Sequence, residues 1–217
     1  MYRLFQRASA PEPSNGLPDD VVTNVVQVFA LVGEAIAGAT HALLSGDRAL
    51  AKRVVENDVL IDERVNDLVA YAEFELMNNN QLTSDARQML LTLLRTMPEV
   101  ERNGDLAEHI ARRAVRGLGS EMTPRSRGLV ERMGEVASDI WRQATDVIVD
   151  GNLDAVTALE DVDDELDDLH VSLTAELTSG SMPVPVAVEL ALMARFYERF
   201  GDHCVNLARR QVGRSHD

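Results

Sequence analysis

The sequence E-R-N-G-D at residues 101–105 returns as E-R-F-G-D at residues 198–202, and this repetition decides the fold. The two copies lie 97 positions apart in a chain of 217 residues. A second match joins residues 61–68 to residues 162–169, which lie 101 positions later. The change of offset indicates that about four residues are missing between the two matches in the second half. The chain is therefore predicted to be a duplication of one unit.

Each copy of the unit reads as three helices. Apolar residues recur with helical spacing, and no segment shows the sustained alternation of a half-buried strand. Capping residues, glycines and prolines mark the ends of the helices. The predicted helices are 19–44, 47–77, 83–115, 124–149, 153–177 and 184–212.

The helices group into two domains. We predict an all-α fold of two tandem antiparallel three-helix bundles, at residues 19–117 and 120–213. Residues 1–18, which contain three of the seven prolines, are predicted to be a disordered lead-in. A hydrophobic fraction of 45% with only 4% aromatic residues suits helix-on-helix packing.

The formal net charge of −15 limits the partners of the chain. Such a surface repels phosphate backbones and anionic lipids, so nucleic acid is not expected as a ligand. Cations or a basic patch on a partner protein are favoured, and such binding should weaken with salt. One cysteine fits a reducing cytoplasm. No apolar run approaches the ~20 residues of a membrane span, so a cytoplasmic protein that reaches membranes only through partners is expected.

The apolar seam of the last helix places the second pentapeptide on the helix surface. Its 4-3-4-3 spacing is typical of helices that pack nearly parallel. Glu198 and Asp202 lie well over a quarter-turn from this seam, in a stripe with three alanines. We therefore expect the acid pair to face outward, where other groups can approach closely. The seam consists of Val186, Leu190, Met193, Tyr197, Phe200, Cys204 and Leu207.

Paired carboxylates predict metal sites. Two acids at i, i+4 repel each other, so something must compensate for them. A solvated acidic face is the ordinary alternative and stays open, but here the pair occurs twice at matching places. Carboxylate oxygens suit hard divalent or trivalent cations, with iron, manganese, magnesium and zinc left open. The candidate ligands, from two helices of each half, are Glu101, Asp105, Asp58 and Asp62, then Glu198, Asp202, Asp163 and Asp167.

Four segments resemble the PhoU proteins, which are phosphate-uptake regulators of bacteria. D-D-E-L-D-D-L-H (163–170) and A-R-F-Y-E-R-F-G-D-H-C-V-N-L-A-R-R (194–210) are similar to the second PhoU repeat. D-V-L-I-D (58–62) and E-R-N-G-D (101–105) are similar to the first repeat. The resemblance covers roughly residues 20–213, and the second repeat looks actinobacterial.

The resemblance implies a fold, a site and partners. PhoU proteins are built as two three-helix bundles, and E(D)-x-x-x-D motifs of some members bind clustered metal ions. The family damps the phosphate-starvation response by linking a phosphate ABC transporter, through its ATPase subunit, to a sensor histidine kinase. By this resemblance the chain is a cytoplasmic adaptor and negative regulator that acts by protein contact. The matching motif positions are Glu101 and Asp105, Glu198 and Asp202, and Asp58 and Asp62.

Three positions depart from the pattern of the family. Asn103 stands where the motif usually has an apolar residue, and His109 stands where the second repeat has Asn206. Leu159 stands where an acid equivalent to Asp58 is expected. The partner carboxylates of the second half are therefore expected at shifted positions, Asp163 and Asp167. We expect the two sites to be unequal and to differ in occupancy.

Other functions stay open at this stage. The sequence shows no Gly-rich phosphate loop, Ser-His-Asp set or zinc-ligand spacing, so we predict that the chain is not an enzyme. An accessory subunit of a low-affinity phosphate transporter is one alternative. A carboxylate metal-buffering protein is another. Whether the chain forms a homodimer is also open.

Overall fold

The computed structural model describes residues 18–150, 155–180 and 182–212. The lead-in predicted for residues 1–18 lies outside the described residues except for its last residue. Within the described ranges the chain is all-α, which confirms the predicted fold class. Its elements are α2 (Asp19–Ser45), α3 (Arg48–Asn78), α4 (Ser84–Val115), the 3₁₀ turn η1 (Leu118–Glu121), α5 (Pro124–Asp150), α6 (Ala155–Thr178) and α7 (Val184–Val212).

Local signals explain where the helices of the first half begin and end. Gly46 ends α2 with a φ of 74°, a left-handed conformation that favours glycine. Asp47 then caps α3, because its carboxylate accepts hydrogen bonds from the backbone amides of Ala49 (3.0 Å) and Leu50 (2.9 Å). Thr83 caps α4 in the same way. The predicted boundaries are therefore confirmed to within a residue or two at these ends.

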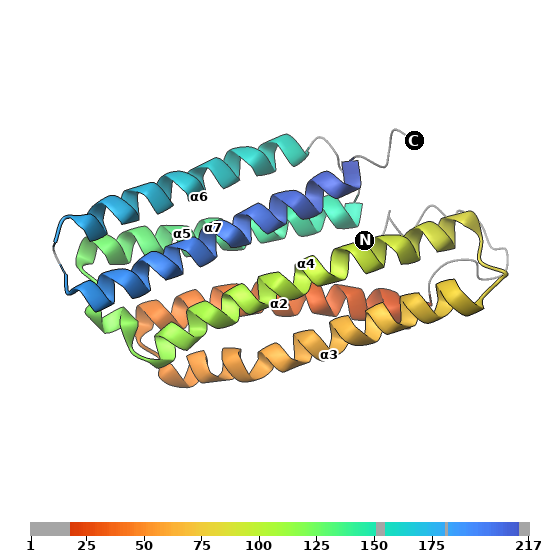
Figure 1. Cartoon of the computed structure of the whole chain (residues 1–217), viewed down its shortest axis with the longest axis horizontal. Helices are drawn as coiled ribbons and strands as arrows, with labels where there is room; N and C mark the ends of the chain where they lie inside the picture. Colours follow the sequence, from red (N-terminus) through yellow and green to blue (C-terminus); the bar gives the residue numbers. More distant parts are fainter. Residues whose placement is uncertain (1–17, 151–154, 181, 213–217) are drawn as a thin grey trace.

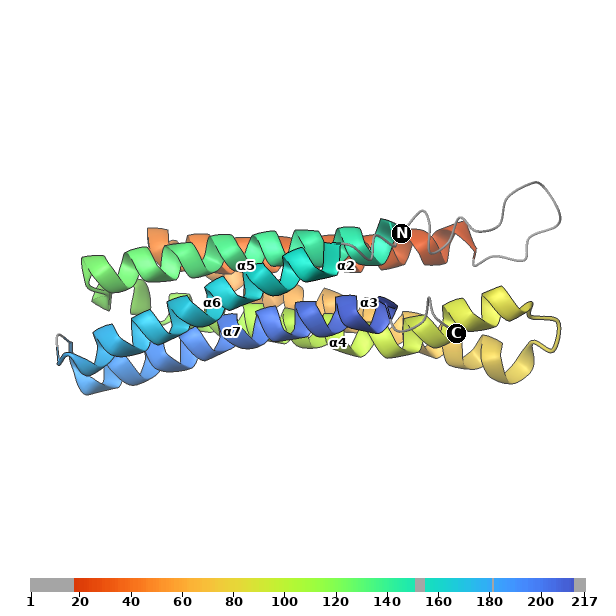
Figure 2. The same cartoon turned by 90° about the horizontal axis from the view of Figure 1, so that it is seen from above.

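Six helices form two three-helix bundles that lie side by side (Figure 1). One bundle contains α2, α3 and α4, and the other contains α5, α6 and α7. Seen from above, α2 and α5 lie along one face of the molecule, and α4 and α7 lie along the opposite face (Figure 2). Each of these pairs is antiparallel. Because the bundles touch through α2 and α5 and through α4 and α7, α3 and α6 lie farthest from the contact between them.

In the contact between α2 and α5, a glycine of each helix faces a larger side chain of the other. Trp141 of α5 stacks on Phe29 of α2 and donates its indole N–H to the Phe29 carbonyl oxygen at 2.9 Å. The indole lies against Gly33, where an added Cβ would be 3.2 Å from the ring. In the reciprocal place, Gly134 of α5 lies against Thr40 of α2. Glycine on one helix thus admits a larger side chain from the other, in each direction.

The contact between α4 and α7 confirms the predicted seam of the last helix. The side chains from Leu190 to Leu207 in that seam are buried, with an exposed fraction of at most 1%. Val186, the first residue of the seam, is only partly buried and packs against this core. Asn103 of α4 is fully buried there and donates to the Cys204 sulfur at 3.5 Å. Cys204 is therefore a core residue, as its position in the seam predicts.

The apolar composition of α2 has a packing explanation. Within the described ranges, α2 is the one helix that is long and apolar enough to cross a membrane by length and composition alone. Glu34 interrupts this stretch, so the expectation that no unbroken apolar run approaches the length of a membrane span is not contradicted. Val28, Val32 and Ile36 are fully buried, and α2 contacts α3, α4 and α5. These contacts are those of a core helix, which needs apolar residues on several sides.

Candidate metal centre

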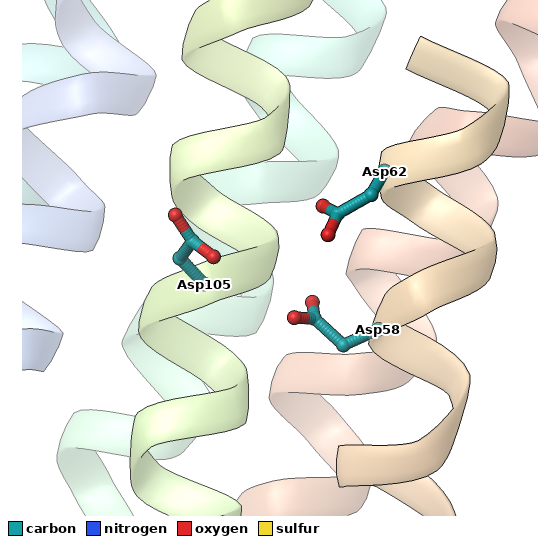
Figure 3. A group of neighbouring side chains, drawn as sticks. All are labelled: Asp58, Asp62 and Asp105. Carbon is teal, nitrogen blue, oxygen red and sulfur yellow. The ribbon is translucent and has the colours of Figure 1, made fainter. Parts of the chain in front are cut away.

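Three carboxylates converge in the outer groove between α3 and α4. Asp58 and Asp62 lie one turn apart on α3 and point toward Asp105 of α4 (Figure 3). One oxygen of each carboxylate lies within 4.8 Å of the other two. Two oxygens bound to one ion at 2.0–2.6 Å are separated by no more than roughly 5 Å, so the spacing suits a shared cation. The predicted first-half ligands therefore come from two adjacent helices, as the sequence indicates.

Burial and mutual repulsion raise the pKa values of this group. Burial, followed by the charges of Asp62, Glu108 and Asp105, raises the pKa of Asp58 to about 7 from 3.8. Burial and the charge of Asp62 also raise the pKa of Glu101 and of Asp105. Negative charge is therefore costly in this groove, and a bound cation would remove that cost.

One oxygen of the group has no hydrogen-bond donor among the described residues. Oδ1 of Asp58 is buried and accepts no hydrogen bond from the residues that the structure describes. A buried carboxylate oxygen without a donor is unfavourable unless a cation or an ordered water satisfies it. The residues present thus fit a hard metal ion. Asp58, Asp62 and Asp105 would hold it, with Glu101 beside them.

The second half has an equivalent acidic residue on α6. Burial, followed by the charges of Asp202, Asp167 and Asp164, raises the pKa of Asp163 to about 7 from 3.8. Burial is thus the first cause for both Asp58 and Asp163, and acids of the neighbouring helix contribute to both. The groove between α6 and α7 therefore repeats the electrostatics of the groove between α3 and α4.

The glycine of each pentapeptide allows this close approach. An added Cβ at Gly104 would lie 3.3 Å from Oδ1 of Asp58, and one at Gly201 would lie 2.4 Å from Oδ1 of Asp163. Any other residue at Gly201 would push the Asp163 carboxylate away. The motif needs glycine because a carboxylate of the preceding helix lies directly over it.

These contacts correct the register of the repeat. Because Gly104 meets Asp58 and Gly201 meets Asp163, the second helices of the two halves match at an offset of 105 and not 101. The alignment at 101 is wrong by four residues, and eight residues rather than four are missing before the third helix. The buried residues agree with the new register: Ala51, Val54, Ile61, Leu68 and Ala72 match Val156, Leu159, Leu166, Leu173 and Leu177.

The new register gives the second half a complete set of acids. Leu159 matches the core residue Val54, so it does not stand in place of Asp58. Asp58 and Asp62 match Asp163 and Asp167, the shifted positions that the sequence suggests. The acids of the third helix, Glu198 and Asp202, match Glu101 and Asp105. Each half therefore presents the same four acidic positions.

The two groups nevertheless differ in geometry. Among the residues that the structure describes, the group of Asp58, Asp62 and Asp105 is the one that brings three such ligand atoms together. In the second half, Glu198 forms an ion pair with Arg195, one turn earlier on α7. To bind a metal ion in the second site, the Glu198 carboxylate would first have to break its ion pair with Arg195. The expected difference in occupancy stays a prediction, and this ion pair gives it a physical reason.

The expectation that the acids face outward is only partly right. Asp105 and Asp202 are exposed, but Glu101 and Glu198 are partly buried. The small residues beside them pack against the neighbouring helix, and Ala194 is fully buried. The acids therefore line a groove between two helices, where the second helix would supply the additional ligands that two carboxylates on one helix lack.

A contact between the bundles was missed by the sequence analysis. Nδ1 of His203 lies 2.8 Å from a carboxylate oxygen of Glu99, on the opposite bundle. Arg210 contacts the other Glu99 oxygen at 3.0 Å. His203 follows the second pentapeptide directly, but its side chain contacts α4 rather than the acidic groove. Neighbours in sequence lie on different sides of a helix, and the sequence does not identify the partner.

Replacing Asp58 by asparagine is expected to stabilise the metal-free protein at pH 8. The folded-state pKa of about 7 lies above the usual 3.8, so folding favours the protonated carboxyl. Stability from this group is therefore present below about pH 4, falls as the pH rises to about 7, and stays lost above it. Asparagine should recover about 1–2 kcal/mol at pH 8, after a discount for partial exposure, and much less at pH 5. Thermal unfolding with a chelator at both pH values measures this difference.

An exposed acid of the same helix provides the control for this experiment. Asp67 lies on α3 and is exposed, so Asp67→Asn should change stability little and equally at both pH values. If Asp58→Asn shifted the unfolding temperature equally at pH 5 and pH 8, repulsion in the groove would not be the cause.

Fold and site together define a class of protein. It is a duplicated three-helix-bundle protein with a carboxylate group in the outer groove of each half. The PhoU domain profile matches residues 25–114 and 130–211, one match for each bundle. The chain belongs to the PhoU family.

Named relatives and solved structures agree with this assignment. The chain is 31% identical over 192 residues to the phosphate-specific transport system accessory protein PhoU homolog 2 of Mycobacterium tuberculosis. That match covers 86% of this chain and 88% of the relative. The crystal structure of PhoU from Pseudomonas aeruginosa is similar with a TM-score of 0.80 at 22% identity, covering 89% of this chain and 94% of that one. The structure of PhoU from Streptococcus pneumoniae is similar with a TM-score of 0.78 at 18% identity, covering 89% and 92%.

Proposed function

We propose that this protein is an accessory and negative regulator of phosphate uptake that acts by protein contact and without catalysis. The observation that carries the proposal is its membership of the PhoU family through both bundles. The mycobacterial relative is named as an accessory protein of the phosphate-specific transport system. The proposed partners are the ATPase subunit of a phosphate ABC transporter and a sensor histidine kinase. Both offer cytoplasmic surfaces, so the proposed location is the cytoplasm.

The acidic grooves support a regulatory role for metal ions. We propose that each groove binds a divalent or trivalent cation, with iron, manganese, magnesium and zinc as candidates. Carboxylates from two helices would hold the ion, so binding would fix α3 against α4 and α6 against α7. The surface that a bundle presents to a partner would then depend on metal occupancy.

A pull-down combined with a deletion strain tests the regulatory proposal. The tagged protein should retain the transporter ATPase and the sensor kinase from detergent-solubilised membranes, while a tagged unrelated helical bundle should not. Deletion of the gene should switch on phosphate-starvation genes in phosphate-rich medium. If neither partner is retained and the starvation genes stay repressed, the regulatory proposal is wrong.

The carboxylate groups are also compatible with one alternative function, metal buffering. A metal-buffering protein would need many ions per chain, whereas two grooves of four acids suit a few ions each. Elemental analysis of the purified protein separates the two functions. A content well above a few ions per chain, in a strain whose starvation response is unaffected by deletion, would favour buffering.

A further inference from the structure

The surface formed by α4 and α7 differs in charge from the rest of this acidic chain. Helix α6 carries eight acids and no lysine or arginine. The surface of α4 and α7, by contrast, is rich in exposed arginines, although the chain as a whole has a formal charge of −15. These arginines are Arg95, Arg102, Arg112, Arg116, Arg195, Arg199, Arg209 and Arg210.

Two of these arginines cover the acid that they pair with. Arg112 contacts Glu108 at 2.5 Å, and the arginine side chain is 59% exposed while the glutamate is 10% exposed. Arg195 pairs with Glu198 in the same arrangement, at 47% against 13%. At these two pairs an approaching partner therefore meets the cation first, because the arginine covers its own carboxylate. Each pair has no net charge, but the group that it exposes is the positive one.

An apolar stripe runs along α7 on the same surface. Val184, Val188 and Leu192 follow one another at intervals of four residues, so they share one side of the helix. Their exposed fractions are 76%, 52% and 44%. Exposed apolar side chains are common singly, but three in a row along one helix side form a strip of the kind that protein contacts cover.

The apolar stripe lies beside arginines of α4. Glu189, the neighbour of Val188, contacts Arg113 at 3.1 Å and Arg116 at 3.4 Å across the gap between α7 and α4. Phe196, four residues after Leu192, lies under the Arg113 guanidinium at 4.6 Å. The stripe therefore runs along the C-terminal half of α4, where arginines flank it. An apolar strip with cations along one side matches a helix that has an apolar side and an acidic flank.

We propose that this surface binds an acidic amphipathic helix of a partner protein. We call it the α4–α7 face. This proposal goes beyond the proposed function. It rests on that function only for the assumption that the protein has a protein partner. The net charge alone predicts a basic partner, but the arginines of this face reverse the sign at the contact. Arginine is also enriched at protein interfaces, where its long stem covers apolar surface. The face consists of Val184, Val188, Leu192, Arg112, Arg116 and Arg195.

A pair of synthetic peptides tests the proposal without the transporter or the kinase. The probe is a fluorescent amphipathic peptide of about 20 residues, with leucines at helical spacing and glutamates on both flanks. Fluorescence anisotropy should show binding of this peptide to the full chain, and the affinity should fall as NaCl rises from about 50 to 300 mM. The double variant Val188→Glu, Leu192→Glu should weaken binding about tenfold or more. A pull-down that failed while this experiment succeeded would reject only the proposed function.

A second exposed apolar pair provides the matched control. Phe74 and Met77 lie near the end of α3, with exposed fractions of 63% and 81%. The variant Phe74→Glu, Met77→Glu should bind the acidic peptide as the wild type does. Equal weakening by both double variants would overturn the proposal.

Three further results would also overturn it. The first is tighter binding of a matched peptide with lysine in place of every glutamate, when that binding is lost in Val188→Glu, Leu192→Glu. The second is self-association of the wild type in sedimentation that the same variant abolishes, because a second copy would then be the occupant. The third is binding of anionic lipid vesicles that depends on Val188 and Leu192. Binding of the acidic peptide with none of these results supports the proposal.

Discussion

A protein with asparagine at Asp58, Asp62 and Asp105 is expected to lose the metal ion proposed for its first half. The oxygens of these residues lie within 4.8 Å of one another, and asparagine keeps the shape of each side chain while removing its charge. Binding of Mn²⁺ or Zn²⁺ at this site should weaken by about a hundredfold or more. Isothermal titration, with elemental analysis of the protein as purified, measures the change.

The second half of the chain provides the control for this prediction. The matching variant replaces Asp163, Asp167 and Asp202 by asparagine, and it should remove the ions of the second groove alone. Metal affinity of the wild type should also fall as the pH drops from about 8 to 6, because protons compete for carboxyls with a pKa of about 7. If neither variant changed the metal content, the metal proposal would fail and the family assignment would stand.

Replacing Gly119 by alanine is expected to destabilise the protein by about 3 kcal/mol. Gly119 lies in η1, which connects the two bundles, and it packs against the last turns of α2. An added Cβ would lie 1.9 Å from the carbonyl oxygen of Leu43. A backbone atom cannot move aside as a flexible side chain can, so η1 or the end of α2 would have to shift. Arg127 also donates to the Gly119 carbonyl oxygen, and this contact would be disturbed.

Another glycine of the same region provides the control, because it shows the effect of replacing glycine by alanine where no clash occurs. Gly128 is exposed within α5, and an added Cβ there meets nothing within 4 Å. Gly128→Ala should stabilise the protein by about 0.5–1 kcal/mol, because alanine favours the helix. Urea unfolding of both variants measures the two effects. A Gly119→Ala protein as stable as Gly128→Ala would show that η1 can move without cost.

The elements of the fold could be predicted from the sequence with good accuracy. Helix ends depend on local chemistry, such as the left-handed Gly46 and the capping carboxylate of Asp47, and these signals lie within a few residues of the ends that they set. The repeated pentapeptide likewise identified the duplication and the four acids of the third helices. Both kinds of inference need only neighbouring residues or identical letters.

The register of the second helices could not be predicted reliably. An error of four residues is close to one helical turn, and after one turn an amphipathic helix presents a similar apolar side again. Matching letters therefore allowed the offset of 101, which places Leu159 opposite Asp58. The contact of Gly201 with Asp163 selects the offset of 105. That contact joins two helices, so no sequence pattern within one helix contains it.

The sequence by itself determined the helices, the duplication and the chemical type of the acidic site. Tertiary structure decided which acids meet, that they line a groove and do not project freely outward, and that Glu99 receives His203 across the two bundles. It also decided which charged groups are exposed, because arginines cover Glu108 and Glu198 on the α4–α7 face. The physical reason is range: propensity and capping act within a turn or two of one helix, whereas burial and charge depend on neighbours about 100 residues away in the chain.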